Sequence, residues 1–161
     1  MNGAAHRQAC NDVTAVDYGL LDDLLGYAIA RANCVADATF HAAVRDRSVT
    51  PLRYAVLEVA GGNPGLPQVQ LAEALALSRP AVTLLLDYWQ AQGCIERRPD
   101  PIDRRSFGIF LTATGISRLA DLRARARSHD SDLCAPLSPT ERAVLKGLLE
   151  KLDQGRIRYM I

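Results

Sequence analysis

Residues 68–112 constrain the fold more than any other part of the chain. Apolar residues recur at helical spacing over residues 68–75 and again over residues 79–92, and only a short turn separates the two runs. Ser78 can cap the second helix, and Pro80 suits its first turn, where a missing N–H leaves no hydrogen bond unmade.

A charged turn between two short apolar runs follows directly. Residues 94–97 and 106–111 have the length and apolar content of paired strands, and the segment RPDPIDRR between them is rich in turn residues. A helix pair followed by a hairpin is the order of a winged helix-turn-helix. The sequence therefore predicts a mainly α fold with a small β-wing, in which the second helix of the pair can enter the major groove of DNA.

Composition alone does not indicate a nucleic-acid-binding protein, because the formal net charge of the 161 residues is only +1. Any such binding must come from the places where individual charges lie. Arg79 can bridge two acceptors on guanine, and Thr83 can contact a phosphate or a thymine methyl. On the hairpin tip, Asp103 can orient Arg105 for a minor groove. The predicted DNA contacts are Gln68, Ser78, Arg79, Thr83, Arg97, Asp103, Arg104 and Arg105.

A long helical pattern precedes this region. It runs from Asp17 to about Arg47, and its apolar residues lie on more than one side of the helix. Such a helix needs two neighbours, of which one is most simply a second subunit. Residues 1–15 are small and polar without a period, and they are predicted to form a flexible arm.

Helix starts and stops are marked elsewhere in the chain. Thr50 can cap a helix that is predicted to end in a left-handed stop at Gly61 and Gly62, and Leu66 can form a very short strand. Thr112 can cap a long helix that follows the hairpin. The last helix is predicted to begin at Ser138, where S-P-T-E has the form of a capping box.

The segment LAEALALSRPAVTLLLDYWQAQGCIERRPDPIDRRSFGIFLTATG resembles the winged-helix core of the MarR family of bacterial transcriptional regulators. The D-R-R of the hairpin, followed six residues later by L-T-x-x-G, is the most recognisable signature of that family. The resemblance covers nearly the whole chain and leaves only the first fifteen residues unassigned. One position departs from the pattern, because Leu84 stands where many relatives place a basic or polar residue.

The resemblance implies a homodimer that binds a palindromic operator, in most cases as a repressor. It assigns residues 16–161 to a single domain, in which 16–47 and 113–161 are dimerisation helices and 50–112 form the DNA-binding lobe. It also implies a small aromatic ligand, often a carboxylate or a phenol, between these helices and the lobe. Such a ligand needs a cation or a hydrogen-bond donor in a mostly apolar cleft. The candidate ligand contacts are Arg31, Phe40, His41, Arg53 and Tyr54.

Alternative functions are also compatible with parts of the sequence. A redox-responsive regulator can act through Cys10, and a winged helix can be a protein-interaction module without DNA binding. An enzyme is not expected, because the neighbouring residues 128–130, Ser-His-Asp, do not converge on a substrate from one helix. No metal or cofactor is expected, since the cysteines form no C-x-x-C pair. Without a bilayer-spanning apolar run or a signal peptide, the chain is predicted to be cytoplasmic.

Overall fold

The computed structural model describes residues 16–99 and 107–157, and their side chains as far as Leu152. The chain divides into two units, of which the first ends at Cys34 and the second begins at Val35. The first unit holds a short 3-10 helix, η1 (Gly19–Asp23), and the beginning of helix α1 (Leu25–Val44). The second unit holds the rest of α1 and all later elements.

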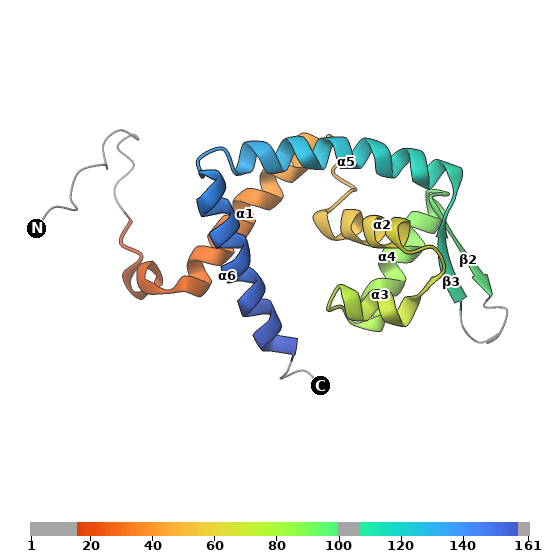
Figure 1. Cartoon of the computed structure of the whole chain (residues 1–161), viewed down its shortest axis with the longest axis horizontal. Helices are drawn as coiled ribbons and strands as arrows, with labels where there is room; N and C mark the ends of the chain where they lie inside the picture. Colours follow the sequence, from red (N-terminus) through yellow and green to blue (C-terminus); the bar gives the residue numbers. More distant parts are fainter. Residues whose placement is uncertain (1–15, 100–106, 158–161) are drawn as a thin grey trace, which may run out of the picture. The chain divides into compact units, whose positions relative to one another are not determined.

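The second unit contains the helix pair and the hairpin that the sequence predicts. After α1 come α2 (Pro51–Gly62), β1 (Leu66–Pro67), α3 (Gln68–Ala74), α4 (Arg79–Ala91), β2 (Ile95–Pro99), β3 (Phe107–Leu111), α5 (Ala113–Leu133) and α6 (Pro139–Ile157). The strands form an antiparallel sheet in the order β1-β3-β2, with Ile95 opposite Leu111 and Leu66 opposite Ile109. Figure 1 shows α2, α3 and α4 beside the hairpin, and α5 packs against α2 and β3. The predicted mainly α fold with a small β-wing is confirmed.

One hydrophobic core joins α2, α3, α4, the hairpin and α5. Its largest fully buried side chains are Val49, Val56, Leu57, Leu71, Val82, Leu86, Trp89, Ile109 and Leu122. The indole N–H of Trp89 donates to the carbonyl oxygen of Arg53 at 2.8 Å, so the one polar atom of that ring is satisfied inside the core. Helix α4 is therefore anchored along its inner face, which fixes the direction of its outer face.

The predicted capping residues start their helices as expected. The Thr50 hydroxyl oxygen accepts the amide of Arg53 at 3.2 Å, and that of Thr112 accepts the amide of Gly115 at 3.1 Å. At the start of α6, the Glu141 carboxylate accepts the amide of Ser138 at 2.8 Å, and the Ser138 hydroxyl oxygen accepts the amide of Glu141 at 3.3 Å. The Ser138 hydroxyl also donates to that carboxylate at 2.7 Å, and this bond, together with the one from the Ser138 amide, lowers the pKa of the Glu141 carboxyl. The capping box is confirmed.

The expectation of one unbroken helix from Asp17 to about Arg47 is wrong at both ends. Gly19 adopts a left-handed φ of +54°, and its amide donates to the Asp17 carboxylate at 2.8 Å, which starts the separate helix η1. Leu24 is extended, with φ −92° and ψ 114°, so α1 begins only at Leu25. At the other end Arg45 takes a φ of +56°, a conformation that ends an α-helix. The apolar pattern is continuous, but the helix is shortened at its start by the Asp17–Gly19 turn and at its end by the left-handed Arg45.

Helix α2 ends at Gly62, as expected, but the left-handed conformation expected at Gly61 and Gly62 is wrong. Both glycines lie within α2, whose C-cap is Asn63 with a φ of −137°. A Cβ on Gly61 would lie 2.5 Å from Cδ2 of Leu119, so a side chain there would displace the Leu119 side chain of α5. The left-handed glycine of this segment is Gly65, with a φ of +85°, where the chain turns into β1.

Candidate nucleic-acid interface

Helices α3 and α4 form a steeply bent pair. They meet at 110°, which lies within the range of helix pairs that read DNA. In the turn between them Ala76 has a left-handed φ of +51°, and the amide of Leu77 donates to the carbonyl oxygen of Ala72 at 2.9 Å. In the part of the chain that the structure describes, no single helix is long and apolar enough to cross a membrane. Only α3 and α4 taken together, as this bent pair, satisfy that test of length and composition.

Helix α4 presents its N-terminal end and one face to solvent. The Ser78 hydroxyl oxygen caps it by accepting the amide of Ala81 at 3.4 Å, and Pro80 lies in its first turn. Ser78 and Arg79 are exposed, whereas the inner face of the helix is buried. The free N–H groups and the positive dipole end of a helix attract phosphate. An exposed arginine at this end can therefore approach DNA together with the helix terminus.

Gln68 and Thr83, both predicted to contact DNA, also contact each other. The Gln68 amide donates to the Thr83 hydroxyl oxygen at 2.6 Å, and that hydroxyl donates to the carbonyl oxygen of Arg79 at 3.0 Å. The Thr83 hydroxyl therefore has no free proton to donate to a phosphate, and it keeps one acceptor lone pair and its methyl group for a further contact. Gln68 keeps its side-chain carbonyl oxygen, and the pair holds α3 against α4.

Arg97 joins the wing to α4. Its guanidinium contacts the Asp87 carboxylate at 2.7 Å and the Gln90 side-chain oxygen at 2.8 Å, and its side chain is only 23% exposed. The neighbouring Arg98 pairs with Glu96, and its guanidinium carbon lies 4.5 Å from the centre of the Phe110 ring. Asp103, Arg104 and Arg105 lie outside the described residues, so the DNA contacts expected of them stay predictions.

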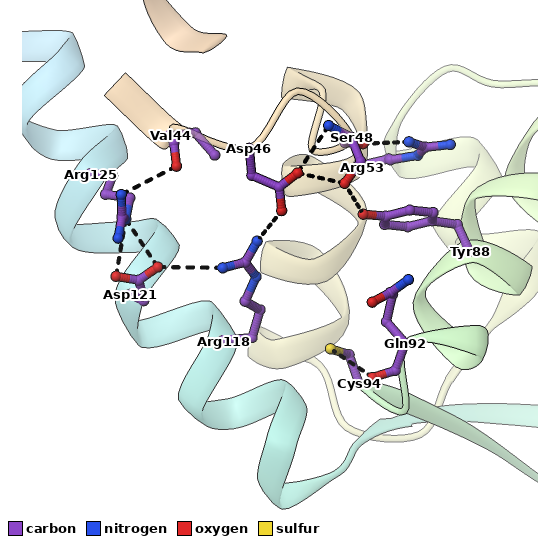
Figure 2. Close-up of polar contacts among 10 residues, drawn as sticks. All are labelled: Val44, Asp46, Ser48, Arg53, Tyr88, Gln92, Cys94, Arg118, Asp121 and Arg125. Carbon is purple, nitrogen blue, oxygen red and sulfur yellow. Dashed lines mark hydrogen bonds and ion pairs between the residues drawn. The ribbon is translucent and has the colours of Figure 1, made fainter. Parts of the chain in front are cut away.

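A chain of polar contacts connects α5 to α4 through the segment between α1 and α2 (Figure 2). Arg118 of α5 donates to the Asp46 carboxylate at 2.6 Å. Asp46 also accepts the Ser48 hydroxyl at 2.6 Å, and the Ser48 oxygen lies 2.7 Å from the Tyr88 hydroxyl of α4. Hydrogen bonds from Ser48, together with Arg118, hold the pKa of the Asp46 carboxyl below its ordinary value. A charged Asp46 thus links the long helix to the helix that can read DNA.

Arg53 strengthens the same connection. Its guanidinium carbon lies 3.8 Å from the centre of the Tyr88 ring, and it also donates to the carbonyl oxygen of Ser48 (Figure 2). Its own carbonyl oxygen accepts the Trp89 indole N–H. The sequence alone did not reveal these contacts, because only the short Asp46-x-Ser48 pattern is local and the other partners lie far away along the chain.

Aromatic side chains gather between α1, α2 and α5. Phe40 is 5% exposed, and its ring centre lies 6.0 Å from that of Tyr54, 5.6 Å from that of His129 and 6.2 Å from that of His41. The Nε2 atom of His129 is 2.9 Å from the Thr39 hydroxyl oxygen. The Nδ1 atom of His41 is buried and has no hydrogen-bond partner among the described residues. His129 is a member of this ring cluster that the sequence pattern did not identify.

An ion pair borders the ring cluster. The Arg123 guanidinium donates twice to Glu58, from Nε at 2.9 Å and from Nη2 at 2.7 Å, and the Tyr54 hydroxyl donates to the same carboxylate at 3.0 Å. Hydrogen bonds from Arg123 lower the pKa of the Glu58 carboxyl. Burial, together with Glu58, raises the pKa of the Tyr54 hydroxyl. At neutral pH Glu58 is therefore charged and Tyr54 keeps its proton.

Two of the predicted ligand contacts, Arg31 and Arg53, lie outside the ring cluster. Arg31 belongs to the first unit, where its guanidinium carbon lies 5.5 Å from the Tyr18 ring centre and 5.9 Å from that of Tyr27. Arg53 faces α4, so Phe40, His41 and Tyr54 are the candidate ligand contacts that lie together. Cys10 and the whole of residues 1–15 lie outside the described residues, and both the redox alternative and the flexible arm stay predictions.

Known proteins resemble this chain in sequence and in structure. The family model described as MarR family matches residues 48–106. A protein of Thauera aromatica, assigned by its name to regulation of the hcr operon, is 31% identical over 147 residues, which are 91% of this chain and 89% of that protein. The transcriptional repressor CouR bound to a 23-mer DNA duplex is 30% identical with a TM-score of 0.82, over 87% of this chain and 99% of CouR. CouR bound to p-coumaroyl-CoA is 28% identical with a TM-score of 0.79, over 86% and 98% of the two chains.

The matched region contains the bent helix pair and most of the wing. It begins at Ser48, which contacts Tyr88, and includes the whole of α4. The similarity to these relatives also includes helices before and after residues 48–106, because it covers about nine-tenths of the chain. On the combined evidence of the family model, the relatives and the fold, this chain belongs to the MarR family of transcriptional regulators.

Proposed function

We propose that the protein represses transcription by binding a palindromic operator as a homodimer, and that a small aromatic ligand releases it. The observation that carries this proposal is the exposed N-terminal end of α4. Ser78 and Arg79 are exposed there, while the inner face of the helix is buried in the core. Arg79 would contact guanine in the major groove. Arg105 would enter a minor groove beside it, oriented by Asp103.

A second copy of the chain would cover the apolar face of α6. This helix exposes five large apolar side chains, each between 42% and 56% exposed: Val144, Leu145, Leu148, Leu149 and Leu152. An apolar surface of this kind favours burial against a partner. Dimerisation through residues 16–47 and 113–161 would place two copies of α4 roughly 34 Å apart, one turn of DNA, so that both half-sites are engaged together.

The ring cluster is the proposed place of ligand recognition. An aromatic ring would pack against Phe40 and Tyr54, and a polar group of the ligand would bond to the buried Nδ1 atom of His41, which has no partner among the described residues. The p-coumaroyl-CoA bound by CouR supports an aromatic acid or its thioester as the ligand class. Binding there would act on α5 and α2, and the Asp46–Arg118 contact would transmit the change toward α4.

Selection of bound duplexes from random DNA tests the proposed function. The full chain is expected to enrich a palindrome, and Arg79→Ala is expected to weaken binding to that duplex by roughly 10- to 100-fold, because it removes a contact to guanine. Fluorescence anisotropy with a labelled duplex measures the affinity. Arg127→Ala removes the same charge from an exposed site on α5 and serves as the control. Enrichment of no sequence, or equal losses for the two variants, contradicts the proposal.

Release by a ligand requires a separate measurement. The bound duplex is titrated with p-coumarate, p-coumaroyl-CoA and coenzyme A alone, and an aromatic compound is expected to release the protein where coenzyme A does not. Tyr54→Leu is expected to raise the ligand concentration for half-release by about tenfold, since it removes one ring of the cluster. Its affinity for DNA without ligand should stay near that of the wild type. If all three compounds leave the complex intact, this ligand class is wrong.

A further inference from the structure

Leu84 is an exposed apolar residue at the centre of the outer face of α4. Its side chain is 71% exposed, while Val82 and Leu86 on either side are fully buried. Two residues of an α-helix span about 200°, so Leu84 points almost directly away from both of them and from the core. In the second turn of α4 it is the exposed residue, since Thr83 and Leu85 are half-buried and Leu86 is buried.

The polar groups beside Leu84 are already bonded within the protein. The Thr83 hydroxyl accepts from Gln68 and donates to the carbonyl oxygen of Arg79. Asp87, one turn further along, accepts from Arg97 of the wing. The second turn of α4 thus offers DNA mainly an aliphatic surface, while the first turn offers the charged Arg79.

We propose that Leu84 reads the 5-methyl group of a thymine in each half-site. This inference rests on the proposed binding of DNA through α4. All four bases carry polar groups on their major-groove edges, and thymine adds a methyl group, which is the apolar feature that a leucine can contact. Exclusion of water between two apolar groups gives that contact its free energy.

Arg79 and Leu84 are separated by about 7.5 Å along the helix axis and by about 140° around it. The guanine read by Arg79 and the thymine read by Leu84 are therefore expected to belong to different base pairs of the same half-site.

Replacing thymine with deoxyuridine removes only the methyl group and tests this contact. In the duplex selected by the full chain, each thymine is replaced in turn, in one half-site and then in both. At one position the affinity is expected to fall about fourfold for one half-site and about fifteenfold for both. The Leu84→Ala variant is expected to bind the thymine and uracil duplexes equally. Leu52→Ala, which shortens a 40% exposed leucine on α2, should keep the full difference.

A second variant asks whether the uracil penalty depends on an aliphatic side chain at position 84. Glutamine ends in a polar amide, so the uracil penalty is expected to disappear in Leu84→Gln as well. A uracil penalty that survives in Leu84→Gln or in Leu84→Ala would assign the methyl contact to another residue and overturn the proposal. Binding that does not change at any uracil position overturns it as well, and would favour a protein partner for Leu84. Failure of the wild-type chain to enrich any duplex would instead remove the proposed function itself.

Discussion

Replacing Leu148 with glutamate is expected to leave the protein monomeric and to weaken operator binding by about a hundredfold or more. Leu148 is 53% exposed in the middle of the apolar face of α6. A carboxylate buried at that place in a dimer would lose its hydration without gaining a partner. The single copy would then hold one half-site at a time, and the gain from simultaneous binding would be lost. Light scattering measures the mass, and anisotropy with the selected duplex measures the affinity.

Two control variants separate this effect from a general loss of folding. Leu148→Met keeps the apolar volume and is expected to remain dimeric with unchanged affinity. Leu52→Glu introduces the same charge at an exposed leucine of α2, outside the α6 face, and is also expected to remain dimeric. If Leu148→Glu is a dimer with wild-type affinity, α6 does not form the interface. A monomeric wild type at micromolar concentration would argue against the homodimer altogether.

Local signals in the sequence were sufficient to predict where most helices begin. Thr50, Ser78 and Thr112 each cap a helix through a hydroxyl oxygen that accepts a nearby amide. Such a cap depends on residues within one turn of itself, so it can be identified without knowledge of the fold. The order of helices and strands followed from these starts together with the apolar periodicity.

The backbone conformation at individual positions could not be predicted from local pattern. Gly61 and Gly62 looked like a left-handed stop because glycine is common there, yet Gly61 is helical and lies against the Leu119 side chain of α5, which a Cβ would displace. The first helix looked continuous because its apolar residues are regularly spaced. The left-handed conformations of Gly19 and Arg45 are single backbone reversals that leave this pattern unchanged.

The candidate site shows the same limit. A sequence does not distinguish an arginine that is free to meet DNA from one that is bonded within the protein. Arg97 is held by Asp87 and Gln90, whereas Arg79 is exposed at the start of α4, although both were predicted to contact DNA. His129 joined the ring cluster only when folding brought α5 beside α1. The buried and exposed faces of the helices could be predicted, but contacts between side chains of distant elements could not.

The glycine of the L-T-x-x-G signature marks one such pair, between α5 and the start of the wing. The Thr112 amide donates to the carbonyl oxygen of Cys94 at 3.0 Å, and the Thr112 hydroxyl donates to that of Gly93 at 2.6 Å. Gly115 follows one turn later and is buried against the same backbone. A Cβ at Gly115 would lie 1.9 Å from the Cys94 carbonyl oxygen and 2.8 Å from its carbonyl carbon. The signature therefore describes a contact between two main chains that a side chain would prevent.

Replacing Gly115 with alanine is expected to lower the free energy of unfolding by about 3 kcal/mol or more, and the melting temperature by roughly 10 °C. The Cys94 carbonyl is part of the backbone and cannot rotate away, so α5 would have to move off the wing. The same substitution at Gly62 is the control, because no atom in the described part of the chain lies within 4 Å of a Cβ built there. Gly62→Ala is expected to melt near the wild-type temperature or slightly above it, since alanine restricts the unfolded chain. Thermal unfolding followed by circular dichroism compares the two variants, and equal melting temperatures would mean that α5 does not approach the wing through Gly115.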